Sequence, residues 1–271
     1  MHTSFGKLAS VLLALGTLCT TAMAQSDPRA VTAVRAAVNS QMAADRTDRS
    51  NWIYTHHDTT EDHDDISLCV GSPQGEMCRT LKHHGVPLSA AEQQSESNRL
   101  SEYVHDISAQ AKNRKNQAHD DAQATQLLKM LPDGFIWTIT SDTPEFLTLA
   151  YRPNPQFDPP NMQARVFSAM AGTLVVVKNG DLIRSFTGSL TEDVKIGFGI
   201  LGRLTKGGRI DIERRDVGSN HWEITEEHVH IGGHALFFKS IGTQQDDVKT
   251  NWRPSPAQNL QDVEEQLRNA R

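Results

Sequence analysis

This 271-residue sequence has no excess of positive charge. Its 27 Lys and Arg residues are outnumbered by 33 Asp and Glu residues, which gives a net charge of −6. Nucleic acids and anionic lipid surfaces attract proteins through clustered Lys and Arg. The composition therefore predicts neither a nucleic-acid-binding protein nor one held on a membrane by charge alone.

Common catalytic motifs are missing as well. The sequence contains neither G-x-S-x-G nor H-E-x-x-H, which are typical of serine hydrolases and zinc peptidases. Residues 197–202 do spell G-x-G-x-x-G, but a dinucleotide site needs this motif between a strand and a helix, whereas a second strand follows here. We identify no catalytic residue, no metal ligand and no cofactor, and we expect a protein that is not an enzyme.

The chain also lacks a hydrophobic run long enough to span a bilayer, which takes about 20 residues. Its main apolar run, residues 8–18, follows Lys7 and precedes the small-x-small site at Ala22 and Ala24. This is the pattern of a secretory signal peptide. We predict a signal peptide over residues 1–24, cleavage after Ala24, export to the periplasm or cell envelope, and no transmembrane span. The mature chain would carry a charge of −7, because Lys7 is the one charged residue removed.

Only three cysteines are present, and Cys19 lies in the signal peptide. Cys69 and Cys78 flank residues 71–75, which are rich in turn formers. Exported proteins meet an oxidising environment, so this pair predicts a disulfide that closes a hairpin. Metal binding is the alternative, but two cysteines with eight residues between them and no second Cys or His pair at matching spacing are a weak zinc signal.

Five helical segments are predicted. Asp27 and Pro28 are a good N-cap and first helical residue for a helix that fades at residues 45–50. Ser89 and Glu92 form a capping box that begins a long helix. Its predicted buried stripe is Leu100, Tyr103, Val104, Ile107 and Ala111. Further helical segments are expected at residues 121–130, at 163–170 and from Ser255-Pro256 onward.

The rest of the chain predicts strands. Early strands are expected at residues 51–56, 66–70, 76–82, 135–139 and 146–151. Residues 172–248 then read as short strands separated by tight turns at Asn179-Gly180, Gly207-Gly208 and Gly232-Gly233. Successive hairpins without helical crossovers make an antiparallel meander. We predict an α+β fold with one domain over residues 25–271 and a helical insertion at about 88–131.

The meander strands alternate apolar and polar residues, so one face of the sheet must be covered. This apolar face is our candidate lining for an apolar ligand, although ordinary core packing explains the same pattern. The candidate ligand-lining residues are Leu174, Val176, Phe186, Val194, Ile196, Phe198, Ile210, Ile212, Trp222, Ile224, Leu236 and Phe238.

Two groups of histidines invite a metal-binding interpretation. A two-residue turn at Gly232-Gly233 would point His228 and His230 to one face of the hairpin and His234 to the other. This geometry argues against a three-histidine site. The second group is the acidic, His-rich stretch at residues 56–65, which we interpret as a solvated loop between strands.

Parts of the sequence resemble a known family. Residues 85–92, 171–176, 182–184 and 194–199, together with Trp222, are similar to uncharacterised secreted bacterial proteins. These in turn resemble the periplasmic outer-membrane lipoprotein carriers, the LolA/LolB-like superfamily. The resemblance implies a half-open antiparallel β-barrel wrapped around amphipathic helices, a concave apolar face for acyl chains, and no cofactor.

Three functions follow as hypotheses. The first is an exported periplasmic binding protein that holds an acylated or other apolar ligand, with envelope lipoproteins or outer-membrane components as partners. The second is a non-catalytic envelope scaffold or sensor with a filled core. The third is a metal-dependent enzyme that uses a site without a recognised motif.

Overall fold

The structure, a computed structural model, describes residues 25–196, 202–235 and 240–269. The predicted signal peptide at residues 1–24 lies outside the described residues. Three of the candidate lining residues, Phe198, Leu236 and Phe238, lie outside them too.

Helices and strands alternate irregularly along the described chain. The helices are α1 (Pro28–Thr47), α2 (Ala90–His105), α3 (Ile107–Gly134), α4 (Met162–Ser168) and α5 (Leu260–Asn269). The strands of the first half are β1 (Trp52–Thr60), β2 (Asp64–Ser72), β3 (Gly75–His83), β4 (Val86–Pro87), β5 (Phe135–Asp142) and β6 (Phe146–Pro153). Those of the second half are β7 (Met170–Val177), β8 (Leu182–Leu190), β9 (Val194–Ile196), β10 (Gly202–Leu204), β11 (Arg209–Asp216), β12 (Trp222–Ala235) and β13 (Ser240–Pro254).

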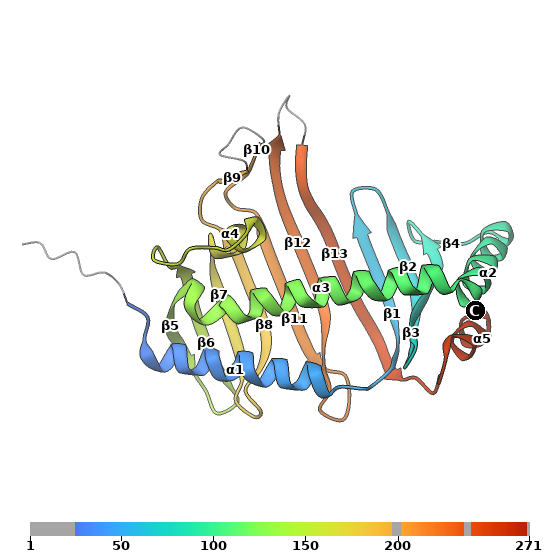
Figure 1. Ribbon diagram of the computed structural model, residues 1–271, viewed down its shortest axis with the longest axis horizontal. Coiled ribbons are helices and arrows are strands. Elements are labelled where there is room, and N and C mark those ends of the chain that lie inside the picture. Colours follow the sequence, from blue (N-terminus) through green and yellow to red (C-terminus); the bar gives the residue numbers. More distant parts are fainter. Residues whose placement is uncertain (1–24, 197–201, 236–239, 270–271) are drawn as a thin grey trace, which may run out of the picture.

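The strands of the described residues form one antiparallel sheet of 13 strands. Its main path runs β4-β3-β2-β1-β13-β12-β11-β8-β7-β6-β5, and β9 and β10 branch from β12. Figure 1 shows β5 and β4 near opposite ends of this sheet. The α+β class and the antiparallel meander are confirmed. Over the described residues the sheet does not close into a barrel, because its two end strands do not pair.

One face of the sheet carries the main core, and we call it the inner face. Trp137, Leu174 and Phe186 point from it and are buried against α1, whose Val34 and Val38 recur at helical spacing. Figure 1 shows α1 lying across these strands. Burying each such side chain contributes about 1.5–3 kcal/mol, so this end of the inner face is a packed core.

A glycine makes room for an aromatic side chain in this core. The Tyr151 hydroxyl of β6 reaches across β7 and donates a hydrogen bond of 3.0 Å to the Thr187 carbonyl of β8. A Cβ atom on Gly188 would lie 2.0 Å from the Tyr151 oxygen. Tyr151 also stacks on Phe186 at 4.9 Å between ring centroids. Gly188 therefore serves close packing rather than a turn.

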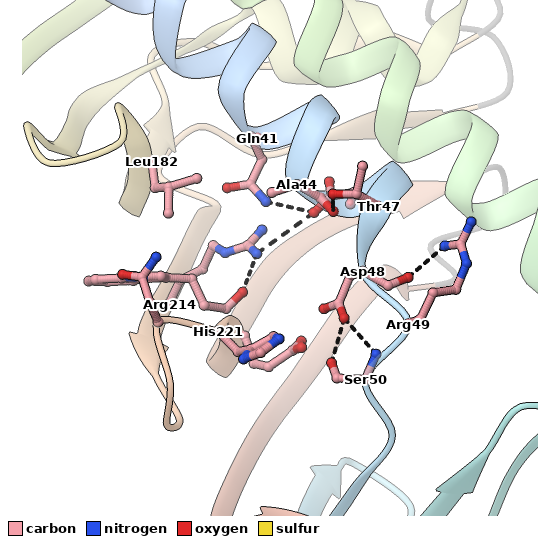
Figure 2. Close-up of a pocket in the computed structure, with 13 residues that line it drawn as sticks. Gln41, Ala44, Thr47, Asp48, Arg49, Ser50, Leu182, Arg214 and His221 are labelled. Atoms are coloured by element: carbon pink, nitrogen blue, oxygen red, sulfur yellow. Dashed lines mark hydrogen bonds and ion pairs between the residues drawn. The ribbon is translucent and has the colours of Figure 1, made fainter. Parts of the chain in front are cut away.

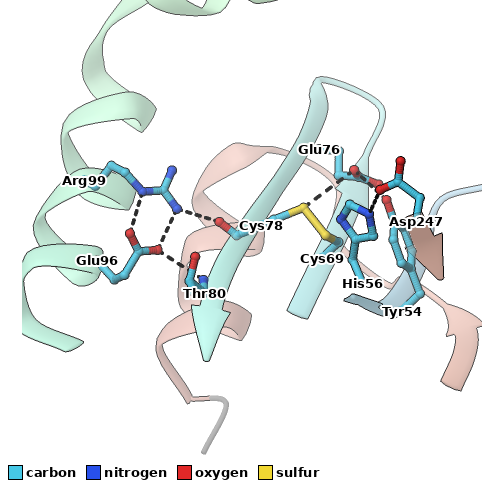
Figure 3. Close-up of a disulfide and its surroundings, with 9 residues drawn as sticks. All are labelled: Tyr54, His56, Cys69, Glu76, Cys78, Thr80, Glu96, Arg99 and Asp247. Atoms are coloured by element: carbon cyan, nitrogen blue, oxygen red, sulfur yellow. Dashed lines mark hydrogen bonds and ion pairs between the residues drawn. A yellow bond between two sulfur atoms is a disulfide. The ribbon is translucent and has the colours of Figure 1, made fainter. Parts of the chain in front are cut away.

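At the other end of the sheet the opposite, outer face is covered instead. Ile53, Val70 and Met77 form a second core with α2 and α5. An anchor beside this core links α2 to β3, because Arg99 donates to the Cys78 carbonyl at 2.6 Å and pairs with Glu96 (Figure 3). In the described part of the chain, the inner face of β1, β12 and β13 is thus left without the packed cover that α1 gives to β5–β8.

The predicted disulfide is confirmed. Cys69 and Cys78 are directly paired across β2 and β3, with a Cα–Cα distance of 4.0 Å, and their sulfurs are bonded (Figure 3). The predicted helix starts at Asp27 and Ser89 are confirmed too. The Asp27 side chain accepts from the Arg29 amide, and Ser89 and Glu92 form both bonds of the capping box.

The long helix after Ser89 is two helices, which corrects its predicted stripe. Asp106 ends α2 and caps α3, since its side chain accepts from the Ala109 amide. Beyond this break Ile107 is 76% exposed, so the buried positions of α2 are Leu100 and Val104. The last predicted helix also begins later than Ser255, at Leu260. Among the described residues, no helix is both long and apolar enough to cross a membrane.

The predicted turn at Gly232-Gly233 is wrong. Both residues lie inside β12, which continues to Ala235. A Cβ atom on Gly233 would lie 2.3 Å from the Arg203 carbonyl oxygen, so the glycine allows β10 to approach β12 closely. Gly207 does lie in a turn with a φ of 87°, but that turn joins β10 to β11, which do not pair. The Asn179-Gly180 hairpin between β7 and β8 is confirmed.

Candidate functional site

Helix α3 crosses the uncovered part of the inner face. Figure 1 shows it passing in front of β12, β13 and β1 on its way from α2 to α1. Every side chain at residues 111–122, in the middle of α3, is exposed. A helix that packed on the sheet would bury a stripe of side chains at helical spacing. The middle of α3 therefore spans the sheet as a bridge, with open space beneath it.

The space beneath α3 is a groove with two adjoining cavities. The first has a volume of about 580 Å³ and lies between Gln117 and Asp121 of α3 and the strands below. The second, of about 480 Å³, lies beside the C-terminal end of α1 (Figure 2). The cavities share four lining residues, Asp45, Ser50, Arg214 and Glu223. We call the two together the α3 groove.

Aromatic rings line one wall of the α3 groove. Tyr54 and Trp252 stack with their centroids 4.5 Å apart, and Trp52 meets Trp252 edge-on at 6.1 Å. His221 contacts the other side of Trp52 at 5.5 Å. The Lys249 ammonium lies 5.8 Å from the Tyr54 ring centroid. Such a wall offers the π faces on which cations and planar groups bind.

Carboxylates dominate the charge of the groove. The first cavity is lined by Asp45, Glu76, Asp121 and Glu223 against Arg214 and Lys249. Glu76 is accessible to solvent, but it stands on the cavity floor, where the protein around it raises its pKa. The Tyr54 hydroxyl donates to Glu76 at 2.8 Å and partly offsets that rise (Figure 3). Burial and the Glu76 charge raise the pKa of Tyr54, so its hydroxyl stays protonated.

The neighbouring strands add further acids. Burial raises the pKa of Glu223 and of Glu227. Asp247 faces Glu227 across β12 and β13. Burial also opposes the charge of Asp247, but a hydrogen bond of 2.6 Å to His56 helps to bring its pKa below the ordinary value. The groove and the strands that continue from it thus carry carboxylates whose negative charge is only partly compensated by the protein.

Two buried polar atoms in the second cavity have no partner among the described residues. Gln41 is 1% exposed and its amide nitrogen donates to Asp45 at 2.7 Å, but its oxygen Oε1 accepts no hydrogen bond. Arg214 donates through Nη2 to the Trp222 carbonyl, while its Nε has no acceptor. Figure 2 shows both side chains at this cavity. Burying a polar group without a partner costs about 1–3 kcal/mol. Both atoms are closed off from solvent, so a ligand in the cavity recovers this cost only when the two side chains turn toward it.

The structure separates the predicted ligand-lining residues into two groups. Leu174, Val176, Phe186 and Val194 are buried in the core beneath α1, and Ile210 packs against that core. Ile196 of β9 and Ile212 of β11 are half-buried. In contrast, Trp222 lines the second cavity and Ile224 the first.

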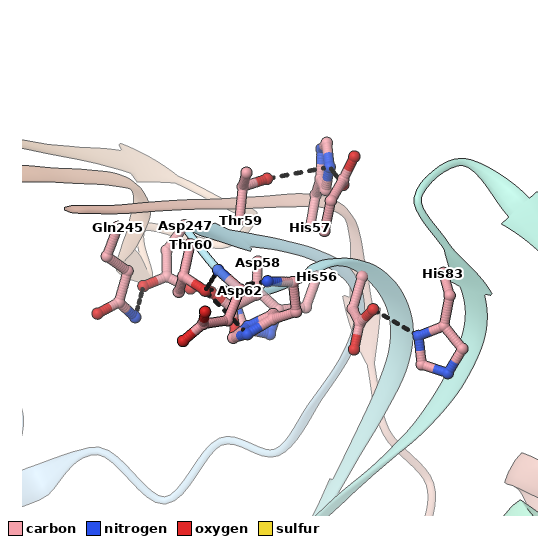
Figure 4. A network of polar contacts seen from close by, with 12 residues as sticks. His56, His57, Asp58, Thr59, Thr60, Asp62, His83, Gln245 and Asp247 are labelled. Carbon is pink, nitrogen blue, oxygen red and sulfur yellow. Dashed lines mark hydrogen bonds and ion pairs between the residues drawn. The ribbon is translucent and has the colours of Figure 1, made fainter.

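The His-rich stretch at residues 56–65 is not a loop, contrary to prediction. Most of it belongs to β1 and β2, and each histidine pairs with a carboxylate (Figure 4). The pairs are His56–Asp247 at 2.6 Å, His57–Asp64 at 2.6 Å and His63–Asp58 at 2.7 Å. Asp58 and Asp65 hold the pKa of His63 and His83 above their usual range through direct hydrogen bonds.

Sequence reasoning missed Gln41, Arg214 and Glu223. They belong to α1, β11 and β12, so no local motif joins them. The available signal was the polar, non-amphipathic middle of α3, which cannot pack on an apolar sheet.

Comparisons with protein-family models, curated proteins and solved structures find no match to this chain.

Proposed function

We propose that this protein is an exported, non-catalytic binding protein whose ligand occupies the α3 groove. The observation that carries the proposal is the pair of buried, unpartnered polar atoms, Gln41 Oε1 and Arg214 Nε, at one cavity. A hydrogen-bond donor of the ligand satisfies Gln41 Oε1, whereas Arg214 Nε needs a separate acceptor. The Cys69–Cys78 disulfide supports export, since disulfides persist in oxidising compartments.

The chemistry of the groove favours a ligand that carries an amine. Burial disfavours the charged forms of Glu223, which lines both cavities, and of Glu227, which lies farther along β12, and a ligand cation would supply the missing counter-charge. The stacked rings of Tyr54 and Trp252 are suited to an ammonium group and to the apolar body attached to it. The proposed ligand class is therefore an organic amine with an apolar portion.

An acyl chain is the second candidate ligand. It follows from the predicted apolar lining, and it would have to enter among Leu174, Val176 and Phe186. These side chains pack with α1, so a chain there would displace core contacts. The groove needs no such rearrangement, and we therefore rank the amine first.

Calorimetric titration with matched eight-carbon probes tests the proposal. Octylammonium, octanol and octanoate share a chain and differ in the charge of the head group. We expect octylammonium to bind most tightly and octanoate least, because the groove carries more carboxylates than cations. Glu223→Gln should weaken octylammonium binding by about tenfold, which corresponds to about 1.4 kcal/mol.

Glu213→Gln is the matched control. Glu213 lies on β11 next to Arg214 but points to the outer face, where it pairs with Arg184. This variant should bind octylammonium as the wild type does. Tighter binding of octanoate, unaffected by Glu223→Gln, would favour the acyl-chain carrier. Binding of none of the probes would refute both ligand classes and leave an envelope scaffold.

A further inference from the structure

A second cluster of polar side chains lies on the outer face, behind the α3 groove. His228 and His230 occupy alternate positions of β12, so both point to the same side. Asp246 of β13 lies opposite His228. Its Oδ1 is 2.5 Å from His228 Nδ1 and 3.0 Å from His230 Nε2. One carboxylate is thus held between two imidazole rings.

Because β12 runs on without a turn, His234 does not point to the opposite face from His228 and His230. With no turn at Gly232-Gly233, His228, His230 and His234 all share one face of a single strand. His234 lies four residues beyond His230 and has Ser240 as its cross-strand partner. Four residues span about 13 Å along a strand, and this distance keeps His234 outside the cluster.

A neighbouring carboxylate has one oxygen without a hydrogen-bond partner among the described residues. Asp211 of β11 is the cross-strand partner of His228 and shares its face. Its Oδ2 pairs with Arg209 at 2.5 Å, while Oδ1 is buried and accepts no hydrogen bond from any residue that the structure describes. The cluster therefore combines two imidazoles, one shared carboxylate and a second carboxylate oxygen without a partner.

This arrangement differs from the other histidine pairs of the described chain. His56, His57, His63 and His83 each contact one carboxylate, whereas Asp246 contacts two imidazoles. Among the described residues, only Cys69, Glu76 and Cys78 offer three ligand atoms that all lie within 4.8 Å of one another, but the two sulfurs are bonded to each other. His228, His230 and Asp246 are spread more widely, so a ring must turn before all three reach one ion. A disulfide offers no thiolate, and thiolate is the form of Cys that binds a metal ion.

We propose that His228, His230 and Asp246 form a binding site for a late first-row divalent metal ion, with Zn²⁺ as the representative. Two histidines and one carboxylate are an established ligand set for such ions, and a strand presents alternate residues to one centre. The metal ion replaces the protons shared between Asp246 and the two rings. Both rings are half-exposed, at 34% and 48%, so they are free to rotate onto the ion.

The site is independent of the α3 groove. Asp246 and Asp247 are consecutive on β13 and point to opposite faces, and Asp247 contacts His56 on the inner face. Loss of metal binding therefore leaves octylammonium binding intact, and the two proposals fail separately.

Titration of tag-free protein with Zn²⁺, followed by calorimetry at neutral pH, tests the site. We expect one Zn²⁺ per chain. His230→Ala and Asp246→Asn should each weaken Zn²⁺ binding at least tenfold. In imidazole ¹H–¹⁵N spectra, Zn²⁺ should shift the ring signals of His228 and His230.

His83→Ala is the matched control, because His83 is equally exposed, pairs with Asp65 alone, and lies on β3, four strands from β12. It should bind Zn²⁺ as the wild type does. Asp246→Asn keeps the shape of the side chain, and far-UV circular dichroism checks that each variant is folded. No Zn²⁺ binding by the wild type would overturn the proposal. Equal binding by His230→Ala and Asp246→Asn, or ring shifts at other histidines only, would do so too.

Discussion

Tyr54 and Glu76 are joined by a hydrogen bond of 2.8 Å on the floor of the α3 groove, where the Tyr54 hydroxyl donates to the Glu76 carboxylate. Tyr54 itself is 7% exposed and stacks on Trp252. The pair connects the aromatic wall of the groove to its acidic floor. It also holds a carboxylate at a place where the surrounding protein disfavours negative charge.

Tyr54→Phe should raise the pKa of Glu76 further. The hydroxyl stabilises the charged form of the carboxylate, so its removal leaves the opposing effect of the surrounding protein less balanced. We also expect a loss of about 0.5–1.5 kcal/mol in the free energy of unfolding, the usual worth of one hydrogen bond. Carboxyl ¹³C titration by NMR measures the pKa. An unchanged or lower pKa for Glu76 would show that the hydroxyl does not stabilise the carboxylate.

Glu227→Gln should stabilise the ligand-free protein at neutral pH. Burial raises the folded-state pKa of Glu227 above its ordinary value of 4.5. Because the folded state holds this proton more tightly than the unfolded state does, protonation of Glu227 contributes to the free energy of unfolding. This contribution is complete below a pH equal to the ordinary pKa and is lost as the pH rises through the folded-state pKa. The melting temperature of the variant should therefore exceed that of the wild type at neutral pH, by up to a few degrees, and converge with it in acid. A variant that melts lower at neutral pH would contradict the raised pKa.

Replacing both Cys69 and Cys78 with Ala should lower the free energy of unfolding by about 2–3 kcal/mol, because the closed loop is short. Urea unfolding of the variant and of oxidised wild type gives the difference. Reduced wild-type protein should have nearly the same midpoint urea concentration as the variant. Equal midpoints for the variant and the oxidised protein would mean that the bond does not stabilise the fold.

Gly188→Ala should destabilise the fold by about 1–3 kcal/mol, the usual cost of overpacking a core. The new methyl group would meet the Tyr151 hydroxyl at 2.0 Å. Gly232→Ala is the matched strand control, because the nearest atom to its methyl group lies 3.9 Å away. Thermal unfolding compares the two. Similar melting temperatures for both variants would show that Tyr151 moves aside at little cost.

Local signals made part of this structure predictable. The Asp27 and Ser89 caps and the Cys69–Cys78 pair depend on residues close in sequence, and all three are confirmed. Gly232-Gly233 is predicted wrongly because glycine pairs also occur where two strands come close, which only the tertiary structure reveals.

The α3 groove is beyond sequence reasoning for a related reason. The pairing of β1 with β13 brings together residues about 190 positions apart, such as His56 and Asp247. The alternation of apolar residues marks the covered face but not the helix that covers it. Hence Leu174 and Phe186 were candidates for a ligand site although α1 packs on them.

The four tryptophans offer the most direct test of the groove as the ligand site. Trp52 and Trp252 line its first cavity and Trp222 its second, whereas Trp137 is fully buried in the core and donates its indole N–H to the Leu131 carbonyl at 3.0 Å. The measurement is the shift of the four indole N–H signals in ¹H–¹⁵N spectra on addition of octylammonium. We expect the signals of Trp52, Trp222 and Trp252 to move and that of Trp137 to stay. A shift at Trp137 alone, or at none of the four, would contradict the proposed site.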